Sequence, residues 1–387
     1  MSRQLALATV AFTVCFYGWS LLGPLSPDLQ EDLGLSDFET SVLVAVPVLM
    51  GSLMRIPLGW LTDRYGGRRV FAALMAFAPL PLVALALWHD ALAPILVFGF
   101  FLGFAGASFA VGVPFVNAWY PPARQGAALG IYGVGTSGTV LAGLTAPRIA
   151  DAWGLAAPFW FAAALVAIMA VVFALLGRDA PRGERRGPAP SMFAALSVFR
   201  SSGRAWALAL FYFLSFGGFI AMFLYLPKLL TGEYDISKAD AGARAAGFAL
   251  LAVVGRPVGG VLSDRIGAVR VLLVSLAGVT ALALVLAVAY SSIVPLTIAC
   301  LTLAVALGLG QGATFKLVPE WFPERVGAVT GVVGAAGGLG GFFPPLVLGA
   351  VGYELGFALM AAVGGLCVVV LRALHGAGAP AIAQSKG

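Results

Sequence analysis

The chain has 387 residues, of which 60% are hydrophobic and only 10% are charged. Soluble domains carry about 25% charged residues, so this composition excludes a soluble enzyme and indicates a protein that lies in lipid. The formal charge of +6 does not indicate binding to nucleic acid, because the basic residues are spread over short loops and form no patch.

Apolar stretches long enough to cross a bilayer recur along the whole chain, since a bilayer core takes about 20 apolar residues per helix. The expected spans are 5–23, 39–61, 69–88, 92–118, 126–150, 157–177, 205–229, 242–263, 268–289, 293–316, 326–350 and 354–373. We keep the first as a helix rather than a signal peptide, because the next apolar run follows within one loop. The sequence therefore predicts an all-α membrane protein with twelve transmembrane helices.

The longest polar stretch, 178–204, is rich in Arg, Pro and Ser and separates six spans from six spans. We expect an N-terminal six-helix bundle over 1–177, a cytoplasmic linker over 178–204, a C-terminal six-helix bundle over 205–373 and a cytoplasmic tail over 374–387.

Lys and Arg residues fall mainly on one side of this topology. With the N-terminus inside, the cytoplasmic side collects Arg3, Arg64, Arg68, Arg69, Arg124, Arg178, Arg182, Arg185, Arg186, Arg200, Arg204, Arg265, Arg270, Lys316, Arg325, Arg372 and Lys386. The outer side collects Arg148, Lys228, Lys238 and Arg244. The positive-inside rule then predicts a multi-pass protein of the cell (inner) membrane with both termini cytoplasmic.

The two halves repeat one another. Arg55 precedes Asp63 by eight residues in the second span, and Arg256 precedes Asp264 by eight in the eighth. A second repeat pairs Gly106-Ala-Ser-Phe109 with Gly312-Ala-Thr-Phe315. Parallel repeats of this kind predict two pseudo-symmetric bundles with a binding site between them near the membrane midplane, and alternating access by rocking of the halves.

Arg55 and Arg256 are the two charges that lie deep in apolar spans. At about 1.5 Å per residue each lies about 12 Å inside, close to the middle of a core about 30 Å thick. No Asp or Glu is expected at that depth to form an ion pair, so a transported anion is the favoured partner. A guanidinium fork matches flat oxyanions such as nitrate, nitrite or a carboxylate.

The loop after the second span resembles the loop motif of the major facilitator superfamily. The resemblance rests on Gly59, Asp63, Arg64, Gly66 and Arg68, and Asp264 and Arg265 repeat part of it in the second half. It implies the twelve-helix major facilitator fold, in which this loop looks like a conformational latch rather than a substrate contact.

Within that superfamily the chain resembles the nitrate/nitrite porter family. The resemblance implies two binding arginines, Arg55 and Arg256, and three aromatic rings that pack on the anion, namely Phe109, Tyr212 and Phe216. Two glycine stripes resemble the nitrate signatures of the family: Gly130, Gly133, Gly135 and Gly138, then Gly331, Gly334, Gly337, Gly338 and Gly341. The chain departs from the pattern at Thr136 and Ser137, which follow the first glycines where the family usually has Asn.

We therefore expect a transporter of a small planar anion, nitrate or nitrite, that works by exchange because no carboxylate or histidine lies at mid-depth to carry a proton. The alternatives are a porter of cyanate, formate or a short carboxylate, proton symport, and a membrane sensor on a transporter scaffold. We expect no metal and no cofactor, because Cys15, Cys300 and Cys367 lie in apolar spans and His89 and His375 near chain turns or ends. The expected partners are the anion and membrane lipid, without nucleic acid, and the expected state is monomeric.

Overall fold

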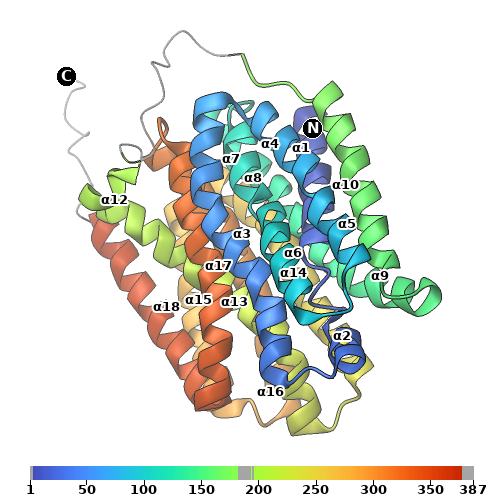
Figure 1. The fold of residues 1–387 in the computed structure, drawn as a ribbon. Coiled ribbons are helices and arrows are strands. Elements are labelled where there is room, and N and C mark those ends of the chain that lie inside the picture. The colour runs from blue at the N-terminus through green and yellow to red at the C-terminus, as the bar shows by residue number, and fades with distance from the viewer. Residues whose placement is uncertain (1–2, 182–192, 194–195, 377–387) are drawn as a thin grey trace, which may run out of the picture.

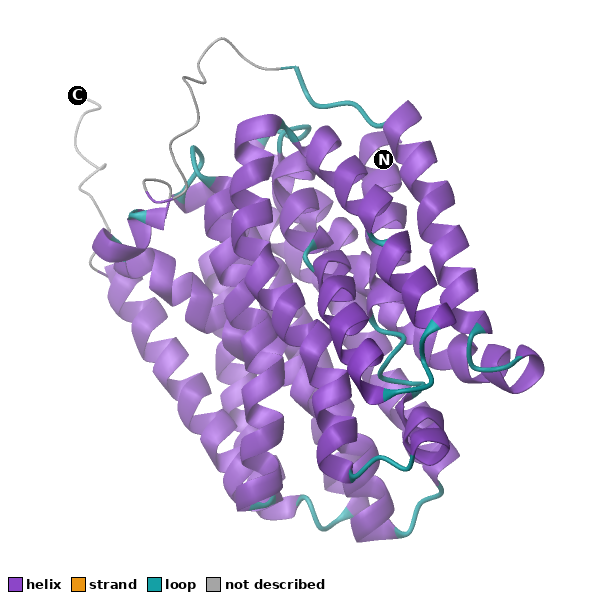
Figure 2. Ribbon diagram, in the orientation of Figure 1, coloured by secondary structure: helices purple, strands orange, loops and turns teal. Residues whose placement is uncertain are grey.

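The computed structural model describes residues 3–181, 193 and 196–376, and those residues form helices without any strand (Figures 1 and 2). The first half contains α1 (Arg3–Trp19), α2 (Ser26–Leu33), α3 (Asp37–Tyr65), α4 (Gly67–Phe77), α5 (Pro79–Leu87), α6 (Leu92–Gly106), α7 (Ser108–Asn117), α8 (Gln125–Gly133), α9 (Ser137–Trp153) and α10 (Ala157–Leu176), with the 3₁₀ turns η1 (Pro122–Arg124) and η2 (Val134–Thr136). The second half contains α12 (Val198–Ser201), α13 (Gly203–Tyr234), α14 (Lys238–Ile266), α15 (Ala268–Ala289), α16 (Ile293–Trp321), α17 (Val326–Val351) and α18 (Tyr353–Gly376).

Helices occupy all twelve predicted spans, and the predicted all-α membrane fold is confirmed. Ten helical segments of the described chain are long and apolar enough to cross a membrane. Two further helices occupy the remaining spans, α1 with 17 residues and α17 with 26 residues. Most of the predicted linker and tail, at 182–192, 194–195 and 377–387, lies outside the described residues.

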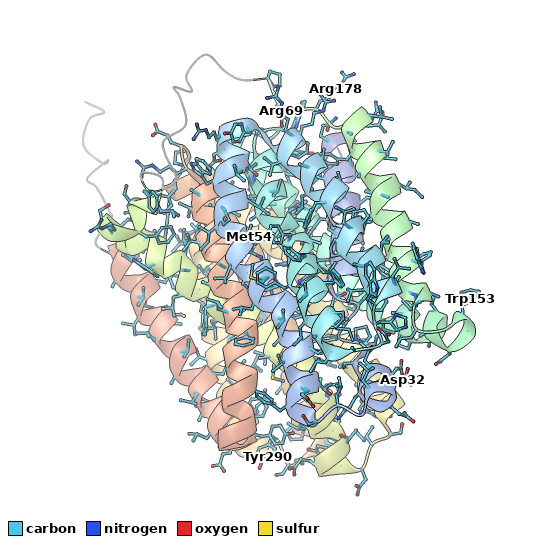
Figure 3. All side chains as sticks on the ribbon, viewed as in Figure 1. Asp32, Met54, Arg69, Trp153, Arg178 and Tyr290 are labelled. Carbon is cyan, nitrogen blue, oxygen red and sulfur yellow. The ribbon has the colours of Figure 1, made fainter. Side chains whose placement is uncertain are left out.

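The short helix α2 was not expected, because its eight residues are mostly polar and follow the first span directly. It lies at the end of the bundle marked by Asp32 and Tyr290 in Figure 3. Arg69 and Arg178 mark the opposite end, where both ends of the described chain also lie (Figures 1 and 3). We name these the α2 end and the latch end.

Three spans of the first half are broken, whereas their repeats in the second half are continuous. The third span divides at Ala78 ahead of Pro79, the fourth at Ala107, and the fifth at η2. Their counterparts α15, α16 and α17 each run as one helix. Pro79 begins α5 and lacks a backbone donor, and the other two breaks fall in segments rich in glycine, which is a poor helix former.

The two halves pack along two equivalent seams, α3 against α17 and α14 against α8. Glycines allow the backbones to touch at these seams. A Cβ on Gly331 would lie 2.5 Å from the Arg55 carbonyl oxygen, and one on Gly130 would lie 2.6 Å from Pro257 Cα. Any larger residue would push the seam apart, so the seams hold the two arginine-bearing helices against the opposite half.

Candidate functional site

The two arginines of the repeat lie inside the bundle, each about two-thirds of the way along a helix of 29 residues. Arg55 is 1% exposed and Arg256 3% exposed. Met54, which is labelled near the middle of α3 in Figure 3, directly precedes Arg55. Two guanidiniums are therefore removed from water at one level, and each needs a local partner for its charge and its N–H groups.

Arg55 binds backbone carbonyl groups from both halves. Its Nη1 donates to the Gly334 oxygen on α17. Its Nε and Nη2 both lie 3.4 Å from the Gly106 oxygen, at the end of α6. The guanidinium carbon also lies 5.6 Å from the ring centroid of Phe216. The partners of Arg55 are thus oxygen dipoles and one ring face.

Arg256 reaches a carbonyl and two hydroxyl groups. Its Nη1 donates to the Gly133 oxygen at 2.9 Å and to Thr136 Oγ1 at 3.2 Å, both in the first half. Its Nη2 donates to the Tyr212 hydroxyl at 2.6 Å on α13. Arg256 therefore joins the halves through side chains as well as backbone.

Aromatic rings cover both guanidiniums. Phe216 lies under both, because the Arg256 guanidinium carbon is 5.5 Å from its centroid, and Arg256 also lies 5.5 Å from the Phe109 centroid. The rings of Phe109 and Tyr212 are nearly parallel, 4° apart in plane with centroids 6.1 Å apart. Phe315 presents its ring edge-on to both at 4.6 Å. Ring faces attract cations, so these rings hold the forks in a flat, mainly apolar enclosure.

The helix breaks of the first half supply two of the carbonyl partners. At the break in the fourth span, the amide of Ala110 donates to the carbonyl oxygen of Ala107, three residues earlier. At η2, the amide of Ser137 donates to Val134, also three residues earlier. These tighter turns shift the helical donors by one residue, and the preceding carbonyls of Gly106 and Gly133 accept from the arginines. The broken spans thus form part of the site.

Neither arginine forms an ion pair with a carboxylate of the described chain, where the three salt bridges found involve other cations. Carbonyl, hydroxyl and ring partners offset part of the charge but cannot neutralise it. Two positive charges facing one enclosed region favour an anion there. Residues 3–181, 193 and 196–376 also contain no His, Cys, Asp and Glu group that could hold a metal ion.

The predicted signature glycines lie at close contacts between helices. Gly130, Gly133, Gly331, Gly334 and Gly338 face the arginine-bearing helix of the opposite half, Gly338 through Ser52. The others face different neighbours: Gly135 faces Phe12, Gly138 faces Thr13, Gly337 faces Tyr212 and Gly341 faces Ile220. Five of the nine therefore touch the arginine-bearing helices directly, and the rest set the packing around them.

At the latch end, the two repeated aspartates cross between the halves. Asp63 accepts from the amides of Gly327 and Ala328 at 3.0 Å each. Asp264 accepts from the amides of Gly126 and Ala127 at 3.0 and 2.7 Å. Each carboxylate therefore caps the N-terminus of a helix in the other half, where the helix dipole favours negative charge. Gly59 leaves room for this approach, because its Cβ would lie 2.3 Å from the Gly327 oxygen.

Lys316 strengthens one of these contacts. Its Nζ lies 2.8 Å from Asp264 and 3.5 Å from Glu320, and it donates to the Pro122 oxygen in the first half. It is 3% exposed, so its ion pair with Asp264 is buried within the second half, and its hydrogen bond to Pro122 links that pair to the first half. The equivalent position in the first half, counted from the repeated Gly-Ala-Ser/Thr-Phe segment, is Ala110.

The other predicted latch residues do not cross between the halves in the contacts described. Arg64 lies over the rings of Trp60 and Tyr65 on its own helix. Arg68 binds Asp179 and Ala174 at the end of the first half, and Gly66 allows Asp179 to approach. Arg265 is exposed.

The sequence reasoning missed two kinds of site residue. Phe315 encloses the site with Phe109, and the repeat that pairs these two phenylalanines was the signal that could have found it. Gly106 contributes a carbonyl oxygen, which no side-chain pattern reveals. Thr136 and Ser137 are the two residues at which the chain was expected to depart from the family's glycine signature. Thr136 binds Arg256, whereas Ser137 is half-buried and contributes its amide to η2.

Comparison with known proteins places the chain in a family. The model of the Major Facilitator Superfamily matches residues 8–242 and 212–387. The probable nitrate/nitrite transporter NarK2 of Mycobacterium tuberculosis is 44% identical over 386 residues, which cover 97% of this chain and 96% of that protein. The nitrite extrusion protein of Bacillus subtilis is 37% identical, with 93% and 91% covered. The probable nitrate transporter NarT of Staphylococcus haemolyticus is 37% identical, with 96% of each covered.

Solved structures agree on the fold. The human organic anion transporter MFSD10 superposes with a TM-score of 0.80 at 18% identity, over 95% of this chain and 99% of that one. The proton:xylose symporter XylE superposes with a TM-score of 0.78 at 13% identity, over 95% and 94%. The chain therefore belongs to the major facilitator superfamily and, within it, to the family of bacterial nitrate and nitrite transporters, and it is a multi-pass membrane transporter rather than an enzyme.

Proposed function

We propose that the protein carries nitrate and nitrite across the cell membrane by alternating access, with the anion held between Arg55 and Arg256. The observation that carries this proposal is the pair of buried guanidiniums, one from each half, over the shared ring of Phe216. A flat anion could enter between the rings and take two hydrogen bonds from each fork. The names of the relatives support nitrate and nitrite as that anion.

In this proposal the two halves, 1–177 and 205–373, rock as bodies about the anion. The closed latch end favours a state in which the site is reached from the α2 end. Excess Lys and Arg at the latch end supports a cytoplasmic placement of that end and of both termini, and one copy of the chain suffices because both arginines come from it. Phe109, Tyr212 and Phe216 would pack on the anion, and Thr136 would orient Arg256.

We further propose that transport is an exchange of nitrate against nitrite. No carboxylate of the described chain binds the arginines, so no acidic group at the site is in place to carry a proton. Carbonyl dipoles alone offset less of the charge of the two forks than a bound anion would. Return of the empty carrier should therefore be slow, and return with an anion fast.

The substrate is tested with the purified full chain in proteoliposomes. Uptake of labelled nitrate is measured with nitrite, cyanate, formate and chloride as competitors, and we expect nitrate and nitrite to compete best. A preference for formate or cyanate would move the assignment to a porter of another small anion.

Exchange is tested by loading the liposomes with nitrite or with an inert buffer. We expect internal nitrite to accelerate nitrate entry, without dependence on a proton gradient. Rapid entry into nitrite-free liposomes that follows an inward proton gradient would instead establish symport.

A further inference from the structure

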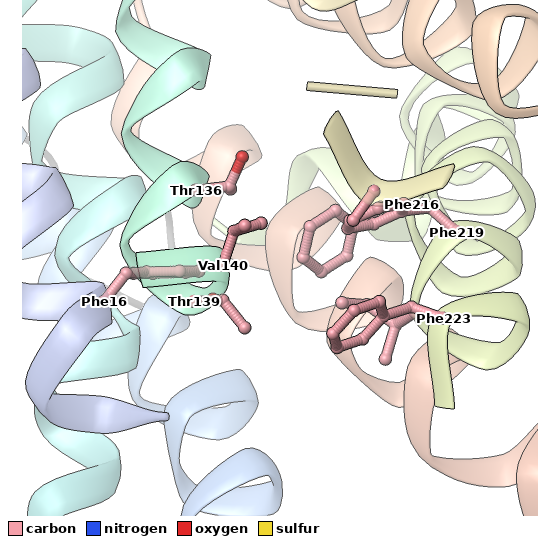
Figure 4. Close-up of a pocket in the computed structure, with 9 residues that line it drawn as sticks. Phe16, Thr136, Thr139, Val140, Phe216, Phe219 and Phe223 are labelled. Atoms are coloured by element: carbon pink, nitrogen blue, oxygen red, sulfur yellow. The ribbon is translucent and has the colours of Figure 1, made fainter. Parts of the chain in front are cut away.

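The pocket drawn in Figure 4 lies next to the arginine site, because Thr136 and Phe216 line it. It lies on the side toward the α2 end, because α13 continues in that direction from Phe216 to Phe223. Phe216, Phe219 and Phe223 of α13 form one wall, and Phe16 of α1 with Thr139 and Val140 of α9 lies across from them. The pocket therefore lies between the two halves. We name Phe16, Thr139, Val140, Phe219 and Phe223 the aromatic vestibule.

The vestibule connects directly with the site. Thr136 and Phe216 line the pocket, and the same two residues contact the arginines: Thr136 accepts from Arg256, and Phe216 lies under both guanidiniums. At the latch end the aspartate contacts hold the halves together. An anion that reaches the arginines in this state must come from the α2 end, past the vestibule.

Aromatic rings follow one face of α13 along this route. Tyr212, Phe216, Phe219 and Phe223 are spaced by four, three and four residues, which places them on one helix face. Successive ring centroids are 5.1, 6.0 and 6.5 Å apart. The stripe extends about 16 Å from the arginine level at about 1.5 Å per residue. No described residue that lines the pocket is charged.

An ion that enters an apolar passage loses hydration water, and this loss costs free energy. Hydrophobic constrictions hold water poorly, and a desolvated charge without new partners is costly. Nitrate and nitrite spread their charge over several atoms and hold water weakly. Formate has the bent O–X–O shape of nitrite but holds water more strongly. A guanidinium fork fits both, so its geometry separates nitrite from formate poorly.

We infer that the aromatic vestibule is a hydration filter, which selects weakly hydrated anions before the arginines select flat ones. The inference rests on the proposed anion transport. It states that the strength of hydration separates anions of the same shape, such as nitrite and formate. The two threonine hydroxyls at Thr136 and Thr139 are the polar side chains that line the pocket, and they would give the entering anion its first hydrogen bonds.

The experiment measures how strongly nitrite and formate each inhibit nitrate uptake in proteoliposomes. The nitrite-to-formate ratio is the inhibitory strength of nitrite divided by that of formate. Phe219→Ser and Val140→Thr each add a hydroxyl to the vestibule, and the second does so at nearly constant volume. We expect each to lower the nitrite-to-formate ratio, by about threefold for Phe219→Ser. The hydroxyl bonds both anions, so only the difference in favour of the more strongly hydrated formate, about half of the 1.4 kcal/mol of one such bond, changes the ratio. Phe219→Leu keeps the passage apolar and should keep the ratio.

The matched control is Phe161→Ser, at a ring on α10 that is 50% exposed on the outside of the bundle, and it should leave the ratio unchanged. The filter is refuted if wild type takes up nitrate and both polar vestibule variants do so with an unaltered ratio. It is also refuted if Phe219→Leu lowers the ratio as much as Phe219→Ser. A wild type that takes up formate in preference to nitrate would overturn the proposed substrate and the filter together.

Discussion

Arg55 and Arg256 occupy equivalent places in the two halves, each eight residues before its aspartate, but their surroundings differ. Arg55 binds the carbonyls of Gly106 and Gly334. Arg256 binds one carbonyl and the hydroxyls of Tyr212 and Thr136. The repeat has preserved the position and depth of the charge, whereas side chains on other helices have made the two ends of the site chemically different.

The two arginines should therefore respond differently to substitution of their neighbours. Backbone carbonyls cannot be removed by a point mutation, so the hydrogen-bond partners of Arg55 are fixed by helix geometry. The environment of Arg256 depends on two side chains and can be tuned. The packing seams, in contrast, are equivalent, since glycine allows the close approach on both sides.

The largest expected effect comes from the arginines themselves. Arg55→Lys and Arg256→Lys should each lower kcat/KM for nitrate by about 100-fold, because lysine cannot form the paired hydrogen bonds of a guanidinium, and two such bonds are worth about 3 kcal/mol. Initial rates in proteoliposomes measure this. Near-normal uptake and affinity in both variants would show that the forks do not hold the anion.

The seams should give equal effects in the two halves. Gly130→Ala and Gly331→Ala each place a Cβ within about 2.6 Å of the opposite backbone, and overpacking costs about 1–3 kcal/mol. We expect transport to fall by about tenfold or more in both. Gly143→Ala on α9, where a Cβ meets nothing within 4 Å, is the control. A clear inequality between the two seam variants would mean that the halves do not close symmetrically.

The buried ion pair with Lys316 should make the Asp264 contact at the latch end sensitive to loss of the carboxylate charge. Asp264→Asn leaves the buried ammonium without its closest carboxylate, and breaking a buried pair costs about 3–5 kcal/mol. We expect a marked fall in the Tm of the purified protein. The double variant Asp264→Asn with Lys316→Met should recover part of that loss, because no buried charge is then left. If the double variant is less stable than Asp264→Asn, the ion pair with Glu320 matters more than that with Asp264.

The smallest effects test the side-chain partners of Arg256. Tyr212→Phe and Thr136→Val each remove one hydrogen bond, worth about 1 kcal/mol, and should raise KM for nitrate by about fivefold. Uptake as a function of nitrate concentration measures this. Thr136→Asn keeps a hydrogen-bond acceptor at this position and should keep a partner for Arg256. A Thr136→Val variant with unchanged KM would show that the hydrogen bond from Arg256 to Thr136 is dispensable for nitrate binding.

The spans and the repeat could be predicted from the sequence because both are local patterns. Apolar length specifies a span, and the register of Arg55 with Asp63 recurs in Arg256 with Asp264. The depth of the arginines followed from that register. The resemblance implied that Phe109, Tyr212 and Phe216 pack on the anion, and the structure brings all three to the arginines.

The remaining features depend on contacts that local patterns do not encode. The breaks at Ala107 and at η2 lie in apolar runs without proline at the break, so the sequence reads as continuous helix there. The aspartates were expected in a latch, but their partners are backbone amides that lie 138 and 264 residues away along the chain. Backbone partners become visible only when the halves are placed together.

The crossed caps of Asp63 and Asp264 have a consequence for how the carrier responds to its solvent. Helices α8 and α17 each receive a cap from the opposite half, so parting the halves at the latch end leaves four amides that water must solvate. Opening there is thus a hydration reaction at two helix ends. Osmolytes that are excluded from protein surface favour states with less exposed surface. Sucrose in the surrounding solution should then shift the resting population toward the state with a closed latch, even without any change in anion concentration.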